Sequence, residues 1–186
     1  MKRALAALAF ALLAASPAAA ARWNVDYAKS RLGFTVMWSG EAFNATFKTW
    51  NATIDFDPAH LAAAHAKVSI VLDSEDSGSA DNDDGVKGAE GFSVTQFPTA
   101  IFETTSFKAT GGNGYVATGT LNLHGAARPI TLPFTLTFAG NTAHMIGKAV
   151  VSRLDFGLGA TGEWAGETPI AHAVTITVDL TATKAP

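Results

Sequence analysis

The sequence contains no cysteine. This absence excludes a disulfide framework, a thiolate metal site, a cysteine nucleophile and a lipid-modified N-terminal cysteine. The stability of the fold must therefore come from burial of apolar side chains and from closure of a sheet. The sequence also lacks an apolar run of the roughly 20 residues that a membrane-spanning helix needs, so we expect no membrane span.

Charged residues are few, and basic clusters are missing. Lysine and arginine number 13 against 16 aspartates and glutamates, which gives a formal net charge of -3. Proteins that bind nucleic acid usually carry a basic patch, so nucleic acid is not an expected partner. The length of 186 residues and the 48% hydrophobic content indicate one globular domain with one core.

The N-terminus has the pattern of a signal peptide. Lys2 and Arg3 precede the uncharged residues 4–15, and an alanine run at 18–21 follows Ser16 and Pro17. Small residues at this place are what a signal peptidase requires. We therefore predict a signal peptide over residues 1–21, cleavage after Ala20 or Ala21, export to the periplasm, and a mature domain over residues 22–186.

Alternating apolar and polar residues dominate the rest of the chain. The alternation is clearest over residues 128–139 and 171–182, and weaker versions occur at 32–38, 67–72, 101–107, 115–123 and 144–152. A period of two predicts strands with one apolar face. Residues 43–56 are long for one strand and their apolar set changes parity, which predicts a bulge near Lys48 or Thr49.

Helical signals are weak. Asp57 can cap a short helix that begins at Pro58 and continues to about Ala66. A second short helix is predicted from Asp83 toward Phe92, although glycines at 85, 88 and 91 weaken it.

Many strands of similar length without a long helix or a repeat indicate an all-β domain, either a sandwich or a closed barrel. We favour a single extended antiparallel β-barrel of about eight strands, with one or two short helices, because closure leaves no unpaired sheet edge. An interior of that size is filled by side chains or holds one slim ligand.

Residue patterns that would support catalysis or metal binding are weak. The five histidines, at 60, 65, 124, 144 and 172, lack the spacing of a helical metal pair, and no serine lies in a nucleophile elbow. His60 and His65 are expected on a helix surface, and His124 in a hairpin turn. Residues 73–84 partly match a calcium loop but lack flanking helices, so a solvated loop is favoured. We predict no metal, no cofactor and no enzymatic activity.

Three stretches, in order along the chain, resemble the YceI-like family. They are WNVDYAKSRLGFTV at 23–36, GVKGAEGFSVTQFPTAIFETTSF at 85–107 and LNLHGAARPITLPF at 121–134, the most specific of the three. Arg153, Asp155, Phe156 and Gly157 match a further landmark of the family. The resemblance covers Trp23 to Lys184.

The resemblance implies a lipocalin-like barrel in the periplasm that binds a polyisoprenoid lipid in its apolar interior, and dimers occur in the family. The predicted apolar lining is Phe34, Val36, Phe47, Trp50, Phe102, Leu121, Phe134, Leu136 and Phe156. Arg128 and Arg153 are candidates for contact with the lipid head group, although Arg153 could instead pair with Asp155. Two alternatives stay open: a barrel filled by its own side chains that serves as a structural or stress-response partner, and, less favoured, an enzyme acting on a lipid.

Overall fold

The structure is a computed structural model, and it describes residues 20–186. Residues 1–19 of the predicted signal peptide lie outside the described residues. The strands are β1 (Arg22–Val25), β2 (Arg31–Trp38), β3 (Glu41–Phe47), β4 (Trp50–Asp55), β5 (His65–Val71), β6 (Glu75–Asp76), β7 (Thr99–Gly111), β8 (Gly114–Leu123), β9 (Ala126–Ala139), β10 (Thr142–Ser152) and β11 (Ile170–Lys184). The helices are α1 (Ala80–Lys87) and the 3₁₀ helices η1 (Tyr27–Lys29), η2 (Leu61–Ala63), η3 (Leu72–Ser74), η4 (Arg153–Phe156) and η5 (Gly162–Trp164).

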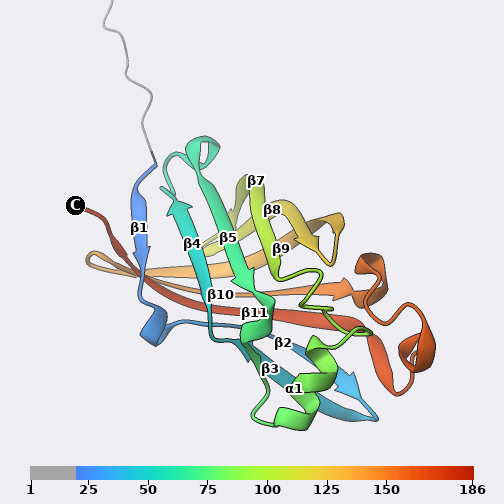
Figure 1. Cartoon of the computed structure of the whole chain (residues 1–186). Coiled ribbons are helices and arrows are strands. Elements are labelled where there is room, and N and C mark those ends of the chain that lie inside the picture. Colours follow the sequence, from blue (N-terminus) through green and yellow to red (C-terminus); the bar gives the residue numbers. More distant parts are fainter. Residues whose placement is uncertain (1–19) are drawn as a thin grey trace, which may run out of the picture.

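All the strands form one antiparallel sheet that closes on itself (Figure 1). The strand order is β1-β4-β5-β7-β8-β9-β10-β11-β2-β3-β6, and β1 also pairs with β11. β1 and β2 lie along the same edge of β11, beside residues 182–184 and 170–179, and so share one position in the barrel. β3 and β4 share the next position in the same way. The predicted antiparallel, lipocalin-like barrel of eight strands is confirmed.

A buried hydroxyl forms hydrogen bonds at the break between β1 and β2. η1 separates β1 from β2, and Ser30 directly follows it. The Ser30 hydroxyl donates to the Asp26 carbonyl at 2.7 Å and accepts from the Thr181 amide at 3.0 Å. These two bonds take the place of the backbone hydrogen bonds that are missing at the break. The pairing with β11 therefore continues from β1 to β2.

The predicted bulge near Lys48 or Thr49 is wrong: the irregularity lies at these residues, but it is a break between two strands. The chain leaves the strand conformation at these two residues, and two separate strands result. The amides of Lys48 and Thr49 donate to the carbonyl and hydroxyl of Ser74, at 2.9 and 3.0 Å. The η3–β6 segment therefore inserts beside β3, and this insertion is a long-range contact that the local pattern does not contain.

The predicted helices differ from the observed ones. The alanine-rich helix predicted from Pro58 to about Ala66 is only the single turn η2, because β5 already begins at His65. Asp57 does not cap it: its Oδ1 accepts from the Ala59 amide at 2.9 Å in the turn before η2, whose N-cap residue is His60. The second helix begins at Ala80, three residues before Asp83, and ends at Lys87. A side chain at Gly91 would lie 2.0 Å from the Val86 carbonyl oxygen, so the chain folds tightly back there instead of continuing as a helix.

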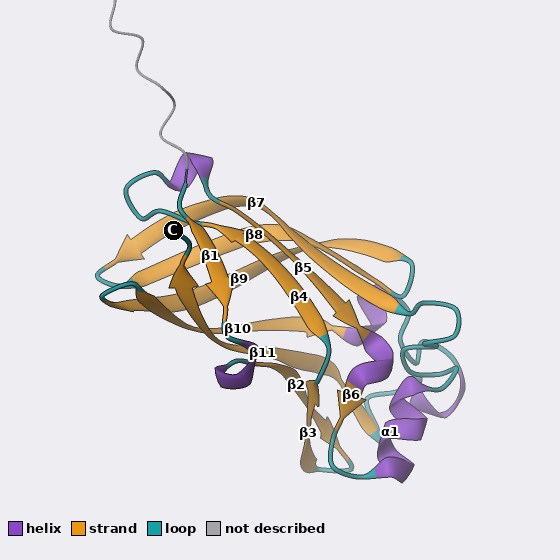
Figure 2. Ribbon diagram, turned by 60° about the vertical axis from the view of Figure 1, so that its left-hand side comes forward, coloured by secondary structure: helices purple, strands orange, loops and turns teal. Residues whose placement is uncertain are grey.

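The two ends of the barrel differ in what covers them. In Figures 1 and 2 the described termini of the chain lie at one end, and α1 with the loops around it lies at the other. We call these the termini end and the α1 end. Among residues 20–186, no helix is both long and apolar enough to cross a membrane.

Candidate ligand cavity

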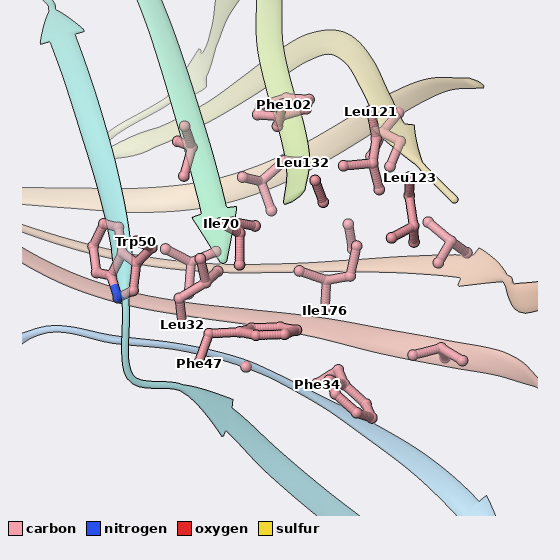
Figure 3. A pocket seen from close by; sticks show the side chains of 18 of the residues that line it. Leu32, Phe34, Phe47, Trp50, Ile70, Phe102, Leu121, Leu123, Leu132 and Ile176 are labelled. Carbon is pink, nitrogen blue, oxygen red and sulfur yellow. The ribbon is translucent and has the colours of Figure 1, made fainter. Parts of the chain in front are cut away.

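The barrel encloses a cavity of about 290 Å³, at the lower end of the range for small-molecule sites. Its lining comes from every strand of the barrel wall, because inward-facing side chains recur at every second residue. Figure 3 shows Phe34 and Phe47 on one side of it and Phe102 and Leu121 on another. The interior is thus not completely filled by side chains.

All nine predicted lining residues border this cavity. They are Phe34, Val36, Phe47, Trp50, Phe102, Leu121, Phe134, Leu136 and Phe156. Phe34, Phe47, Trp50 and Phe102 are only partly buried although they point inward, which is expected for side chains that border a void. Their binding of a lipid stays a prediction.

The termini end is closed by aromatic rings. Phe56, directly after β4, lies with its ring centroid 5.3 Å from that of Phe107, 5.5 Å from that of Tyr115 and 6.3 Å from that of Phe134. The Trp23 indole N–H donates to the Phe56 carbonyl at 2.9 Å and fixes the backbone there. Edge-to-face contacts of this kind are favourable, and they join strands that are not neighbours in the sheet.

Rings at the α1 end line the wall instead. Phe34 on β2 and Phe47 on the adjacent β3 have centroids 5.9 Å apart, and Phe92, after α1, lies 5.9 Å from each of them. Val86 of α1 is buried and borders the cavity beside them. The void is therefore kept between this aromatic wall and the opposite strands.

The described lining residues include only two with a hydroxyl or a charge, Thr104 and Arg153. The Thr104 hydroxyl is already bound to the backbone of Ala66: it accepts from the amide at 2.8 Å and donates to the carbonyl at 3.2 Å. Thr104 therefore leaves the lining effectively apolar.

Arg153 does not pair with Asp155, which corrects that alternative. Its side chain is buried and donates to six backbone carbonyls, those of Leu158, Gly159, Trp164, Gly166, Ile170 and Ala171. All three guanidinium nitrogens are occupied, and the bonds hold the loop between β10 and β11 against the barrel. Contact of Arg153 with a head group stays a prediction, but the structure assigns its donors to this loop.

Arg128 lies outside the cavity. It is exposed and borders a surface groove between β9 and β10, whose pairing ends at Phe134 and Gly147. Pro129 and Pro133 lie in the part of β9 that pairs with β8 but not with β10, and they have no N–H to offer a second neighbour. Ile130 borders both the groove and the cavity, so the wall of the barrel is thin here. Contact of Arg128 with a head group also stays a prediction.

The histidines lie on the surface or in turns. His60 contacts Asp57, and His65 is on strand β5 beside Glu103, not on a helix as predicted. His124 occupies the predicted hairpin turn with a φ of 51°, and its Nδ1 lies 3.0 Å from the Phe156 carbonyl oxygen. This contact connects the β8–β9 turn to η4.

Glu75 is a residue that the sequence analysis overlooked. It is 1% exposed, and neither of its carboxyl oxygens has a hydrogen-bond partner among the described residues. Burial raises the pKa of the Glu75 carboxyl to about 7, and the charges of Asp83 and Asp76 act in the same direction against that of Lys87. The local sequence hides this residue because its neighbours form an ordinary acidic loop.

That acidic loop is not arranged around a cation. Asp83 accepts from the Ser77 amide at 2.9 Å, and Asp76 lies 2.7 Å from the Lys48 ammonium. Within residues 20–186, no group of three or more acidic, histidine or cysteine side chains is placed to hold a metal ion.

Sequence comparisons place relatives along nearly the whole barrel. The family model of the YceI-like domain matches residues 23–182. The UPF0312 protein of Azotobacter vinelandii is 33% identical over 143 residues, which cover 71% of each chain. The UPF0312 protein of Pseudomonas syringae pv. tomato is 31% identical over 173 residues, which cover 87% of this chain and 90% of the relative.

Solved structures share the same barrel. BcnA of Burkholderia cenocepacia is 33% identical, has a TM-score of 0.83, and matches 86% of this chain and 100% of its own. A polyisoprenoid binding domain from Saccharophagus degradans has a TM-score of 0.67 at 16% identity, and the match covers 89% of this chain and 99% of that domain. At this identity, the second likeness shows a shared fold.

Proposed function

Because the chain belongs to the YceI-like family, we propose that it binds a long apolar lipid, of the polyisoprenoid or isoprenoid quinone type, inside its barrel and carries or stores it. The observation that carries this proposal is the apolar cavity, which is bordered by buried side chains of both the termini end and the α1 end. The polyisoprenoid binding domain of the same fold supports the chemical class of the ligand.

The energetics favour a carrier with modest affinity. Each methylene moved from water into the cavity contributes about 0.8 kcal/mol. A lipid that leaves a bilayer exchanges one apolar medium for another, so its tail contributes little net free energy. Selectivity must then come from the width of the cavity and from the few polar groups near it.

The main alternative is a barrel that acts as an interaction protein without a ligand. A barrel of that kind needs no interior space, because tight packing gives its largest stability. The partly buried Phe34, Phe47, Trp50 and Phe102 favour the binding function, since all four large side chains border the cavity.

Lipid extraction tests the proposal. We expect that protein purified from its native compartment without detergent, extracted with organic solvent and analysed by mass spectrometry, releases close to one long-chain isoprenoid lipid per chain. Because we propose a binding protein and not an enzyme, that lipid should be recovered unchanged after prolonged incubation with the protein. Extraction of no lipid would support the ligand-free alternative, and a converted lipid would support an enzyme.

We also propose that residues 1–21 direct export and that the protein works in the periplasm. The carbonyl of Ala21 accepts a hydrogen bond from the Phe56 amide at 2.8 Å, so cleavage after Ala20 preserves a bond that cleavage after Ala21 would remove. We expect the mass of the mature protein from a periplasmic extract to correspond to a chain beginning at Ala21. Recovery of the uncleaved chain in the cytoplasm would contradict export.

A further inference from the structure

β9 and β10 separate partway along the wall of the barrel. Their pairing stops at Phe134 with Gly147. We call the stretch beyond it, where residues 126–133 of β9 and 148–152 of β10 run without pairing to each other, the split. Figure 2 shows the two strands diverging from their common turn. Closure of a barrel otherwise leaves no unpaired strand edge, so the split is an exception in this wall.

The split stays open because each strand is held on its other side. β9 pairs with β8 from Ala126 to Thr135, and β10 pairs with β11 over its whole length. Pro129 and Pro133 on β9 have no N–H that could bond to β10. Among the described residues, no backbone pairing would therefore have to break for a chain to pass between β9 and β10 at the split.

The split lies between the cavity and the surface groove. Ile130, Val151 and Phe156 border both of them. Phe156 is 2% exposed and belongs to η4, which directly follows β10. The side chains between the cavity and the groove are therefore hydrocarbon, and they can change rotamer without losing a hydrogen bond.

Both ends of the barrel are held by hydrogen bonds that the split lacks. At the termini end, the Trp23 indole N–H donates to the Phe56 carbonyl at 2.9 Å among packed rings. At the α1 end, Arg153 donates to four carbonyls of the β10–β11 connection. The Gly159 amide of this connection also donates to the Glu90 carbonyl at 2.8 Å. A chain that passed at either end would displace these groups, so the split is the less costly route.

A long lipid needs such a route. The cavity of about 290 Å³ is at the lower end of the range for small-molecule sites, so a long polyisoprenoid extends beyond it. Inside, Thr104 and Arg153 are already bonded to the backbone, and the polar end of a lipid would find no free partner there. The groove, in contrast, is lined by polar side chains that include Arg128, Thr131 and Asp155.

We propose that the ligand lies across the split, with its apolar chain in the cavity and its polar end in the groove between β9 and β10. The inference rests on the proposed function, because it needs an apolar chain in the cavity. It adds the place at which that chain leaves the barrel, and it makes Ile130, Val151 and Phe156 the borders of the passage.

Single cysteines test this position, because the chain has no cysteine of its own. Thr131→Cys and Val150→Cys place an exposed thiol on the two edges of the split, and both residues border the groove. Thr137→Cys is the matched control, since Thr137 is an exposed threonine on the same strand, in the part that pairs with β10. Asn141→Cys, in the β9–β10 turn, and Glu163→Cys, in η5, report on the termini end and the α1 end.

Each variant of the mature protein is measured without lipid and after loading with solanesol, a long polyprenyl alcohol, from phosphatidylcholine vesicles. Mass spectrometry of an extract establishes that solanesol is retained, and circular dichroism establishes that the variant is folded. The rate of reaction with a maleimide then reports the access of each thiol. On loading, we expect this rate to fall at least roughly tenfold in Thr131→Cys and Val150→Cys and to stay within about twofold in the other three, because thiol reactivity depends on access.

Slower reaction of Asn141→Cys or Glu163→Cys instead of the two split variants would show that the ligand leaves at an end of the barrel. Unchanged rates in all five loaded variants would show that the barrel encloses the whole ligand. Either result would overturn the inference and leave the proposed function standing. Protection of Thr137→Cys equal to that of Thr131→Cys would mean that lipid coats the outside of the barrel and would contradict both. If the parent protein retains no solanesol, the proposed function itself fails.

Discussion

At the termini end of the cavity, aromatic rings from non-neighbouring strands meet one another, whereas at the α1 end aromatic rings from adjacent strands lie side by side along one wall. Phe56 and Phe134 at the first end are 5% and 8% exposed, and Phe34 and Phe47 at the second are only partly buried. The comparison teaches that a ring such as Phe56, which contacts rings of strands that are not its neighbours, is buried more fully than rings that pack along one wall.

The buried charges follow the same division. Arg153 and Glu75 both lie at the α1 end, where loops and α1 cover the barrel. The buried residues at the termini end carry no charge. An end closed only by rings has no polar group to recognise a ligand. The α1 end is therefore the one that holds buried ionisable side chains.

The largest effect is expected from a charge placed in the lining near the termini end. Leu136→Asp puts a carboxylate into the lining, and we expect it to abolish lipid retention in the protein that still folds, because an unpaired charge in an apolar site is strongly unfavourable. Thr135→Asp is the control, since Thr135 is the exposed neighbour on the same strand. Mass spectrometry of extracted lipid measures both.

If Leu136→Asp does not fold, Ile176→Trp fills the lumen without a charge. Ile176 borders the cavity, and we expect the larger side chain to displace the ligand. Undiminished lipid in this variant would show that the ligand lies elsewhere.

Arg153→Ala should lower the free energy of unfolding by more than about 3 kcal/mol, because it leaves several buried carbonyls without a donor. Arg153→Lys should not restore stability, since an ammonium lacks the planar fork. Arg128→Ala removes an exposed arginine and should change stability by less than about 0.5 kcal/mol. Urea denaturation measures all three, and equal effects at the two positions would refute the assigned role of Arg153.

Opening the termini end should change which chains fit. Phe56→Ala removes the central ring of that end, and we expect a loss of about 3 to 5 kcal/mol in stability together with retention of longer lipids, as the cavity extends toward the termini. Ile146→Ala is the control because the Ile146 side chain is 47% exposed and does not border the cavity. An unchanged chain-length distribution in Phe56→Ala would mean that the aromatic rings do not limit the ligand.

The smallest effect is a dependence of stability on pH at the α1 end. The pKa of Glu75 is raised to about 7 in the folded protein, above its value in the unfolded chain, so the folded state binds the proton more tightly. The stabilisation is complete below the unfolded pKa and is lost as pH rises through about 7, by up to roughly 3 kcal/mol. Urea midpoints at pH 5 and pH 8 should differ less in Glu75→Gln than in the parent protein.

Local alternation was sufficient to predict β2, β5 and β7 to β11 and the face of each predicted lining residue, but it missed β1 and β6 and joined β3 to β4. In residues 128–139 the alternation places Phe134 and Leu136 on one side, and both border the cavity, because the side-chain period of a strand is fixed at two. The same alternation also showed the change of parity at Lys48 and Thr49. It could not show that this change is a break between two strands, because the break depends on hydrogen bonds to Ser74, which is distant in the sequence.

The two buried charges could not be predicted from the sequence. Nothing near Arg153 indicates that six backbone carbonyls, four from the β10–β11 connection and two from the start of β11, converge on it, since carbonyls are present at every residue. Glu75 occurs in an acidic stretch, and only its pairing with Phe47 across β3 and β6 removes it from water. The opening between β9 and β10 was equally hidden, although Pro129 and Pro133 indicate it in retrospect.

By itself, the sequence determined that this protein is an apolar-cored antiparallel barrel without disulfides, because side-chain alternation and the absence of cysteine are local properties. Only the tertiary structure decided where the interior stays empty and which ionisable groups lie beside the empty space. Those properties depend on which strands become neighbours when the sheet closes, and the free energy of closure is a sum over contacts between residues far apart in the chain.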